Sequence, residues 1–304
     1  VGIDFRDNNP SISYGNGFDV NYASFTKKTP YSILGLDNAA TGITMSSDGM
    51  KFYLVGNNGD AIYQYSTASP FEIDGMTYDE VMFDISAEDV TPTGIAFSPD
   101  GTKMFATGAE EDEINQYTLG TPFDLSGTVT HNVALSVVDQ DGYPQGLTFN
   151  PSGTKMYMVG TSGDRVYQYA LSSAFDITTG VSFEGSISVL NEESNPGGLA
   201  FSKDGLKLLV IGSLGDEVNQ YALAAPFDIT YGVEFDTNFR MEQQDQGPVD
   251  LIFNPSGTRM YVLGLFNDAI FEYAIDKGEF AESAYNDGSI EGSLDIFLND
   301  KAFV

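Results

Sequence analysis

A single repeat runs through most of this sequence. Glycine recurs every 52 residues in three separate ladders, and tyrosine follows the same step in a fourth. The ladders are Gly42, Gly94, Gly146 and Gly198, with Asp250 next in register; Gly49, Gly101, Gly153, Gly205 and Gly257; Gly56, Gly108, Gly160, Gly212 and Gly264; and Tyr65, Tyr117, Tyr169, Tyr221 and Tyr273. Because four ladders share one period, the chain is an array of structural repeats, and the repeat unit decides the fold.

Residues 92–125 indicate what one repeat forms. Their pattern predicts short strands over 94–97, 103–107 and 113–118, with Asp100-Gly101 as a hairpin turn. Residues 133–137 predict an outer fourth strand. Four strands in about 50 residues, without helical periodicity, are typical of a propeller blade, whereas solenoid repeats are usually shorter and need capping ends. The predicted fold class is therefore all-β, a propeller of four-stranded antiparallel blades.

The two chain ends set the predicted number of blades. Five repeats cover 40–91, 92–143, 144–195, 196–247 and 248–293. Residues 11–20 look like a shortened third strand with its Phe-Asp-Ile tail, 31–36 take the place of a fourth strand, and 294–304 look like an inner pair. Two strands from each end would leave no open sheet edge. We therefore expect one six-bladed domain over 1–304, closed by a blade from 1–39 plus 294–304; alternatively, 289–304 begin a further domain.

Charge and composition exclude several function classes. The chain has 44 acidic against 13 basic residues and a net charge of −31, which argues against partners that present phosphate, such as nucleic acid or anionic lipid. The absence of cysteine excludes disulfides and thiolate metal sites. No apolar run approaches the roughly 18–20 residues of a membrane span. The chain does not start with Met, so we expect a processed chain or a piece of a longer one.

Short strings within the repeat resemble known propeller families. FSPDGTKMF at 97–105, FNPSGTKMY at 149–157 and FNPSGTRMY at 253–261 resemble the YVTN and PD40 repeats. The fuller pattern at 216–221 and 226–229 is similar to the longer propeller repeats of marine phage and bacterial surface proteins. The chain has no Trp, so it departs from typical WD40 proteins. The resemblance implies the fold and an extracellular, cell-surface or virion location, but not an activity, because one fold hosts many functions.

Three charged ladders are candidate site residues. The first lies just before each inner strand and is the candidate calcium site, because converging carboxylates repel unless a cation neutralises them: Asp37, Asp89, Asp141, Glu193 and Asp245. The second lies between strands two and three and is interpreted as structural turn residues: Asp60, Asp112, Asp164, Asp216 and Asp268. The third is expected on the opposite face as a solvated rim: Lys51, Lys103, Lys155, Lys207 and Arg259.

Support for catalysis is thin. His131 is the only histidine, it sits near an outer strand, and no nucleophile-elbow string accompanies it. The Tyr65 ladder is expected to pack between blades. Tyr14, Tyr22, Tyr31 and Tyr231 lie in irregular stretches, where exposed aromatics would suit sugar stacking or a protein partner.

These observations lead to two function hypotheses. The first is a non-enzymatic extracellular or virion-surface module for binding or assembly. It is either an adhesin-like binder of a protein or glycan, or a structural subunit of a fibre or virion that contacts copies of itself. Exposed aromatics clustered on one face would favour the binder, and large contacts between copies would favour the subunit. The alternative is a calcium-dependent, lactonase-type hydrolase, which would need blade-specific acids and Asn in the central channel.

Overall fold

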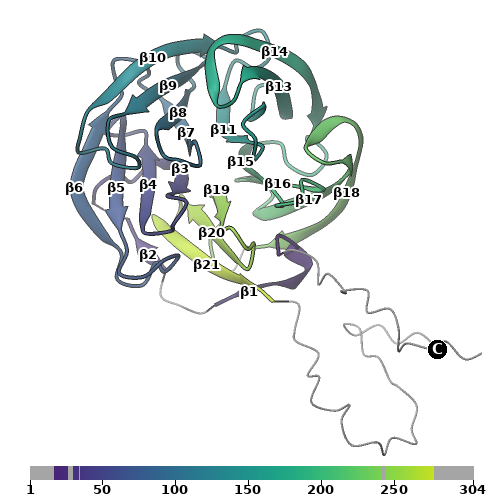
Figure 1. The fold of residues 1–304 in the computed structure, drawn as a ribbon. Helices are drawn as coiled ribbons and strands as arrows, with labels where there is room; N and C mark the ends of the chain where they lie inside the picture. The colour runs from purple at the N-terminus through teal and green to yellow at the C-terminus, as the bar shows by residue number, and fades with distance from the viewer. Residues whose placement is uncertain (1–16, 27–29, 34, 242–243, 277–304) are drawn as a thin grey trace, which may run out of the picture.

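A ring of antiparallel sheets surrounds a central axis in this computed structural model, which describes residues 17–26, 30–33, 35–241 and 244–276 (Figure 1). Each sheet is one blade, with its first strand at the axis and its last strand at the rim. The inner strands contact one another in the cyclic order β3, β7, β11, β15, β19 and back to β3. The ring is therefore closed, and the described residues form a propeller of five blades.

Four blades are continuous in sequence. Blade one holds β3 (Ala40–Met45), β4 (Lys51–Gly56), β5 (Ala61–Ser66) and β6 (Thr77–Asp84). Blade two holds β7 (Pro92–Phe97), β8 (Lys103–Gly108), β9 (Glu113–Leu119) and β10 (Val129–Ser136). Blade three holds β11 (Pro144–Phe149), β12 (Lys155–Gly160), β13 (Arg165–Ser173) and β14 (Asp176–Ser188). Blade four holds β15 (Pro196–Phe201), β16 (Lys207–Gly212), β17 (Glu217–Ala225) and β18 (Asp228–Arg240).

Blade five joins the two ends of the described chain. It holds β19 (Pro248–Phe253), β20 (Arg259–Gly264) and β21 (Ala269–Ile275), and its outer edge is formed by β1 (Ala23–Phe25) and β2 (Tyr31–Ser32). Both N-terminal strands pair antiparallel with β21, Phe25 opposite Tyr273 and Tyr31 opposite Ile270. A 3-10 turn over Val20–Tyr22 precedes them. The fifth repeat thus receives its fourth strand from the N-terminus.

The prediction of six blades was wrong, and the reason lies in residues 17–36. Phe18 donates its backbone N–H to the carbonyl of Gly257 at 2.9 Å, as Phe71 does to Gly49 within blade one. Ile33 donates to the carbonyl of Asp268 at 2.9 Å, as Ile85 does to Asp60. The N-terminal segment is a copy of the repeat, as expected, but it completes blade five and needs no sixth blade. The inner pair expected at 294–304 lies outside the described residues.

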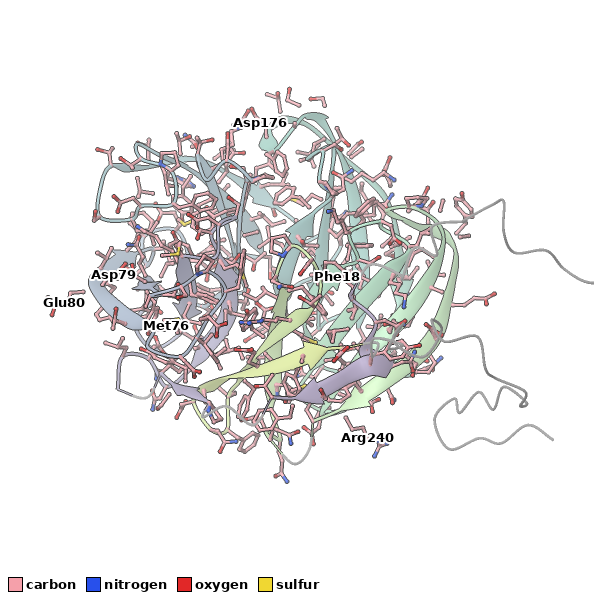
Figure 2. The ribbon with its side chains drawn as sticks, turned by 60° about the horizontal axis from the view of Figure 1, so that its bottom comes forward. Phe18, Met76, Asp79, Glu80, Asp176 and Arg240 are labelled. Atoms are coloured by element: carbon pink, nitrogen blue, oxygen red, sulfur yellow. The ribbon has the colours of Figure 1, made fainter. Side chains whose placement is uncertain are left out.

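The same side chains hold each pair of neighbouring blades together. A glutamine of one blade accepts the backbone N–H that follows the Phe-Asp pair of the next blade, as in Gln64 with Leu125 at 2.9 Å and Gln220 with Val20 at 3.0 Å. Lys207 of blade four forms an ion pair with Asp19 of blade five at 2.6 Å. Lys103 and Asp176 form the equivalent ion pair between blades two and three at 3.4 Å. Figure 2 shows Phe18 inside the outline of the ring and Arg240 projecting from its rim.

Burial follows the strand pattern. The second strand of each blade is largely apolar on both faces because it is covered by the two adjacent blades, as in β12, where Met156 to Val159 are fully buried. The Tyr65 ladder is buried in every blade, in agreement with its expected packing role. The described residues hold no helix long and apolar enough to span a membrane.

Candidate functional site

The ring has two faces, which we name by the loops they carry. The hairpin face carries the turns between the first and second strands: 46–50, 98–102, 150–154, 202–206 and 254–258. The turn face carries the loops that enter the first strands and the turns between the second and third strands. In the described part of the chain these are 33, 35–39, 85–91, 137–143, 189–195, 241 and 244–247, with 57–60, 109–112, 161–164, 213–216 and 265–268.

The Asp37 series lies on the turn face, and its carboxylates are buried. Each accepts one N–H from its own loop and at least one from the neighbouring turn of the same blade. Asp141 accepts from Tyr143 N–H and Gly163 N–H, both at 2.9 Å, and from the Tyr167 hydroxyl at 2.9 Å. Glu193 accepts from Asn195 N–H at 2.8 Å and Gly215 N–H at 3.0 Å. These carboxylates therefore join two loops within each blade.

The structure does not bring the Asp37 series together as one ligand set. Among the described residues, no three His, Cys, Asp or Glu side chains form a group that could hold a metal ion. The calcium site expected at Asp37, Asp89, Asp141, Glu193 and Asp245 stays a prediction that these contacts do not strengthen.

The Asp60 series occupies the turns between the second and third strands. All five members have positive φ, from 46° to 54°, a conformation that Asp tolerates better than most residues. The backbone carbonyls of this series accept hydrogen bonds from the loops that enter the first strands, as in Val137 N–H to Asp112 at 2.8 Å. The structure places these residues in tight turns on the same face as the Asp37 series.

The Lys51 series lies on the hairpin face and reaches across the blade boundaries. Lys155 lies 4.0 Å from Asp228, and Arg259 lies 2.6 Å from Glu72. Lys51 is near Asp124, whose pKa is lowered by hydrogen bonds from Ser126 and, more weakly, by the Lys51 charge. The charges of this series are therefore engaged with carboxylates of the next blade, as Lys103 and Lys207 are.

Two other groups of candidates separate in the structure. His131 is exposed on the outer strand β10, where its Nε2 lies 2.9 Å from Asn115 Oδ1 and its Nδ1 lies 3.9 Å from Glu88. Tyr22 and Tyr231 are exposed, Tyr31 is half-buried against Tyr65, and Tyr14 lies outside the described residues. Among the described residues, no ring contact joins these tyrosines to one another.

The central channel narrows where the glycine ladder meets Asp250. A Cβ on Gly94 would lie 3.0 Å from the Cα of Gly146, and a Cβ on Gly146 would lie 3.0 Å from the Cα of Gly198. Blade five replaces glycine with Asp250, whose carboxylate accepts from Ile43 N–H and Leu251 N–H, each at 2.8 Å. Asp250 therefore lies at this waist, in the position that glycine holds in the other four blades.

A cavity opens on each side of this waist. The one on the hairpin face has a volume of about 350 Å³ and reaches Asp250. The one on the turn face has a volume of about 230 Å³ and is lined by Tyr143, Asn195 and Val249, among others. The two faces of the ring thus offer separate sites.

The turn face also carries most of the exposed large apolar side chains. Fourteen such side chains occur in the described part of the chain, and eight of them lie in turn-face loops. The eight are Leu36, Val90, Val138, Tyr143, Leu190, Leu214, Leu265 and Phe266. Leu214 and Phe266, at 70% and 72% exposure, are the most exposed and hold equivalent positions in blades four and five. This surface could not be predicted from the ladders, because its positions hold large apolar residues in only some of the blades.

Comparisons with known proteins agree at the level of fold. No family model and no curated protein sequence matches the chain. Similar solved structures include a nidogen/laminin complex, at 14% identity and a TM-score of 0.50 over 78% of this chain and 76% of that chain. They also include a luciferin-regenerating enzyme, at 12% identity and a TM-score of 0.50 over 81% of this chain and 94% of that chain.

Other solved structures are longer than this chain. It spans 65% of a functionally unknown protein from Desulfotomaculum acetoxidans, at 14% identity and a TM-score of 0.48 over 74% of this chain. It spans 66% of a periplasmic gluconolactonase from Pseudomonas aeruginosa, at 16% identity and a TM-score of 0.47 over 78% of this chain. At such low identity, the two likenesses with a TM-score of 0.50 agree with the fold described above and show nothing beyond it.

Proposed function

We propose that this propeller is a non-enzymatic binding module that docks a basic protein partner on its turn face through exposed apolar anchors. The observation that carries the proposal is the gathering of eight of the fourteen exposed large apolar side chains in the loops of this one face. Exposed apolar side chains that gather on one face of a protein and stand among polar groups mark a protein interaction site. Leu214 and Phe266 are the expected anchors, because they are the most exposed.

Charge on the same face favours a basic partner. None of the ten turn-face loops contains Lys, Arg or His, and they carry the Asp37 and Asp60 series as well as Glu88, Glu110 and Glu111. Burial and the nearby carboxylates of Asp141, Asp89 and Glu110 raise the pKa of Asp112. The buried Oδ1 atoms of Asp112 and Asp164 accept no hydrogen bond from another protein group. A cationic partner would relieve this crowding and bind by complementary charge.

The acidic charge also bears on the other forms of the hypothesis. Two copies that met turn face to turn face would bring two surfaces of the same sign together, which disfavours a self-associating subunit built through this face. A location outside the cell or on a virion remains part of the proposal and is supported by the repeat resemblance alone. The hydrolase alternative would need several oxygen ligands at one place in the channel, where Asp250 is the blade-specific carboxylate.

A display experiment tests the proposal. A random peptide library is selected against the wild-type chain, and the enriched peptides are sequenced and then titrated against purified variants. We expect enrichment of Lys or Arg together with aromatic or branched apolar residues, and weaker binding as salt rises because screening reduces charge complementarity. Enrichment of acidic or uncharged peptides would overturn the proposal.

A matched pair of variants locates the docking surface. Leu214→Ser with Phe266→Ser removes the two turn-face anchors, whereas Met82→Ser with Tyr231→Ser removes two side chains of 53% and 57% exposure from the rim. The turn-face variant is expected to lose the enriched peptides and the rim variant to keep them. The opposite pattern would place the binding site on the rim.

A further inference from the structure

The cavity on the hairpin face is an apolar funnel with one acid at its base. Its wall is formed by the inner strands, which contribute Phe97, Phe149, Phe201 and Phe253. Its volume of about 350 Å³ lies at the lower end of the range for small-molecule pockets. Of the described residues that line it, two are ionisable: Asp250 at the waist and Lys203 in a hairpin turn.

The acid at the base is a departure from the repeat. The other four blades have glycine at this position, and the close approach of those glycines leaves no room for a side chain between neighbouring inner strands. Asp250 lies in the ring beside Gly198 and donates no hydrogen bond when ionised. It therefore gives an otherwise near-symmetric funnel one chemically distinct point.

Asp250 is buried and only partly satisfied. Its side chain is 7% exposed, and each of its oxygens accepts one backbone N–H, from Ile43 and Leu251. An ionised carboxylate has about four acceptor positions, so about two remain for a further donor. Burial raises the pKa of Asp250 to about 7, because no cation in the described structure offsets the loss of solvation.

We infer that the funnel binds a primary amine that carries a small apolar group, with the ammonium against Asp250 and the apolar group against the phenylalanine wall. An ammonium supplies both the positive charge and the hydrogen-bond donors that the carboxylate lacks. A divalent metal ion fits less well, because it needs several oxygen ligands and the base of the funnel provides one carboxylate. The site lies on the hairpin face, so it stands independently of the proposed partner surface.

A calorimetric comparison of two probes tests the inference. 2-Phenylethylamine is protonated at neutral pH, with a pKa near that of Lys at about 10, whereas 2-phenylethanol has nearly the same shape and no charge. At about pH 8, where Asp250 is ionised, we expect the wild-type chain to bind the amine at least about tenfold more tightly than the alcohol. Equal affinities, or no binding of either probe, would overturn the inference.

Variants and pH assign the preference to Asp250. Asp250→Asn keeps the shape and removes the charge, and Asp250→Gly installs the residue of the other blades; both should abolish the preference for the amine. Lys203→Met is the control and should keep it. On the wild type, amine affinity should fall below about pH 7 while alcohol affinity stays constant, because protonation removes the charge of Asp250. A preference that survives either Asp250 variant, or that does not change with pH, would contradict the inference.

Discussion

The two faces of the ring are built from one repeat, yet they differ in what their charges contact. On the hairpin face, Lys103, Lys155, Lys207 and Arg259 each pair with a carboxylate of the next blade. On the turn face, the loops contain no basic residue, carboxylates crowd together, and apolar side chains are exposed. Positions that repeat on the hairpin rim make contacts between neighbouring blades. Positions that break the repeat, such as Asp250, Leu214 and Phe266, carry the proposed binding functions.

The largest expected effect concerns the seam that closes the ring. Phe18→Ala should lower the free energy of unfolding by roughly 3–5 kcal/mol, because it removes a buried aromatic ring that packs on Phe253 and lies beneath Gly257. Urea unfolding measures it, and Tyr22→Ala, on an exposed neighbour, is the control. A loss below about 1 kcal/mol would show that the N-terminal segment does not close blade five.

Blade closure also shows how far the sequence could predict the fold. The repeat period predicted the strands, the two turn types and the copy of the Phe-Asp motif at Phe18-Asp19. It could not predict the number of blades, because a partial repeat at the N-terminus fits either a sixth blade or the missing fourth strand of blade five. Only pairing between residues far apart in sequence, such as Phe25 with Tyr273, decides between them.

The candidate sites were predicted less well for a related reason. Ladders with one period pointed to Asp37 and Asp60, which the structure uses in loop and turn contacts within each blade. Phe266 and Leu214 do not follow the ladder, and their exposure depends on how loops of adjacent blades lie. The sequence shows Asp250 as a break in the glycine ladder. Its burial at the waist could not be predicted from the sequence, because it depends on the closed ring of inner strands.

The second prediction concerns the pH dependence of stability that Asp250 causes and that glycine, the residue of the other four blades, cannot cause. The folded pKa of about 7 lies above the ordinary pKa of 3.8 for Asp, so the folded state holds its proton more tightly than the unfolded state. The stabilisation from that proton is full below about pH 4 and is lost as pH rises through about 7. Asp250→Gly should therefore gain about 4 kcal/mol relative to wild type between pH 4 and 8, on top of a constant offset from lost hydrogen bonds.

Denaturant titrations of the variant and the wild type at each pH measure the difference in their unfolding free energies. The contributions of the other carboxylates cancel in this difference. Asp228→Asn serves as the control, because hydrogen bonds from Thr230 and the charge of Lys155 lower the pKa of Asp228 despite its partial burial. A stability difference between Asp250→Gly and wild type that does not vary with pH would show that Asp250 is not held in a desolvated waist.

The third prediction concerns a pair of turn-face substitutions that should weaken peptide binding and leave the stability of the ring unchanged. Leu214→Ser with Phe266→Ser should weaken binding of an enriched basic peptide by about 10–100-fold, because loss of an interface anchor typically lowers the free energy of dissociation by more than about 1 kcal/mol. Its unfolding free energy should stay within about 0.5 kcal/mol of wild type, since both side chains are exposed. Fluorescence anisotropy and urea unfolding give the two values. Unchanged affinity with unchanged stability would remove these residues from the interface.

The smallest expected effect is on the hairpin rim. Lys103→Met breaks the ion pair with Asp176 and the 2.8 Å hydrogen bond to the Phe175 carbonyl. Because both charged side chains are about a quarter exposed, the loss of stability should be below about 1 kcal/mol. Thermal unfolding at low and high salt measures it. A loss of several kcal/mol would mean that the ion-pair ring contributes as much to closure as the aromatic packing.

Amide hydrogen exchange of the wild-type chain, with and without a saturating enriched peptide, shows which face of the ring the partner covers. We expect slower exchange in the turn-face segments 213–216 and 265–268, and unchanged exchange in the hairpin turns 202–206 and 254–258 of the same two blades. Protection confined to the hairpin turns, with none on the turn face, would contradict the assignment of the partner surface.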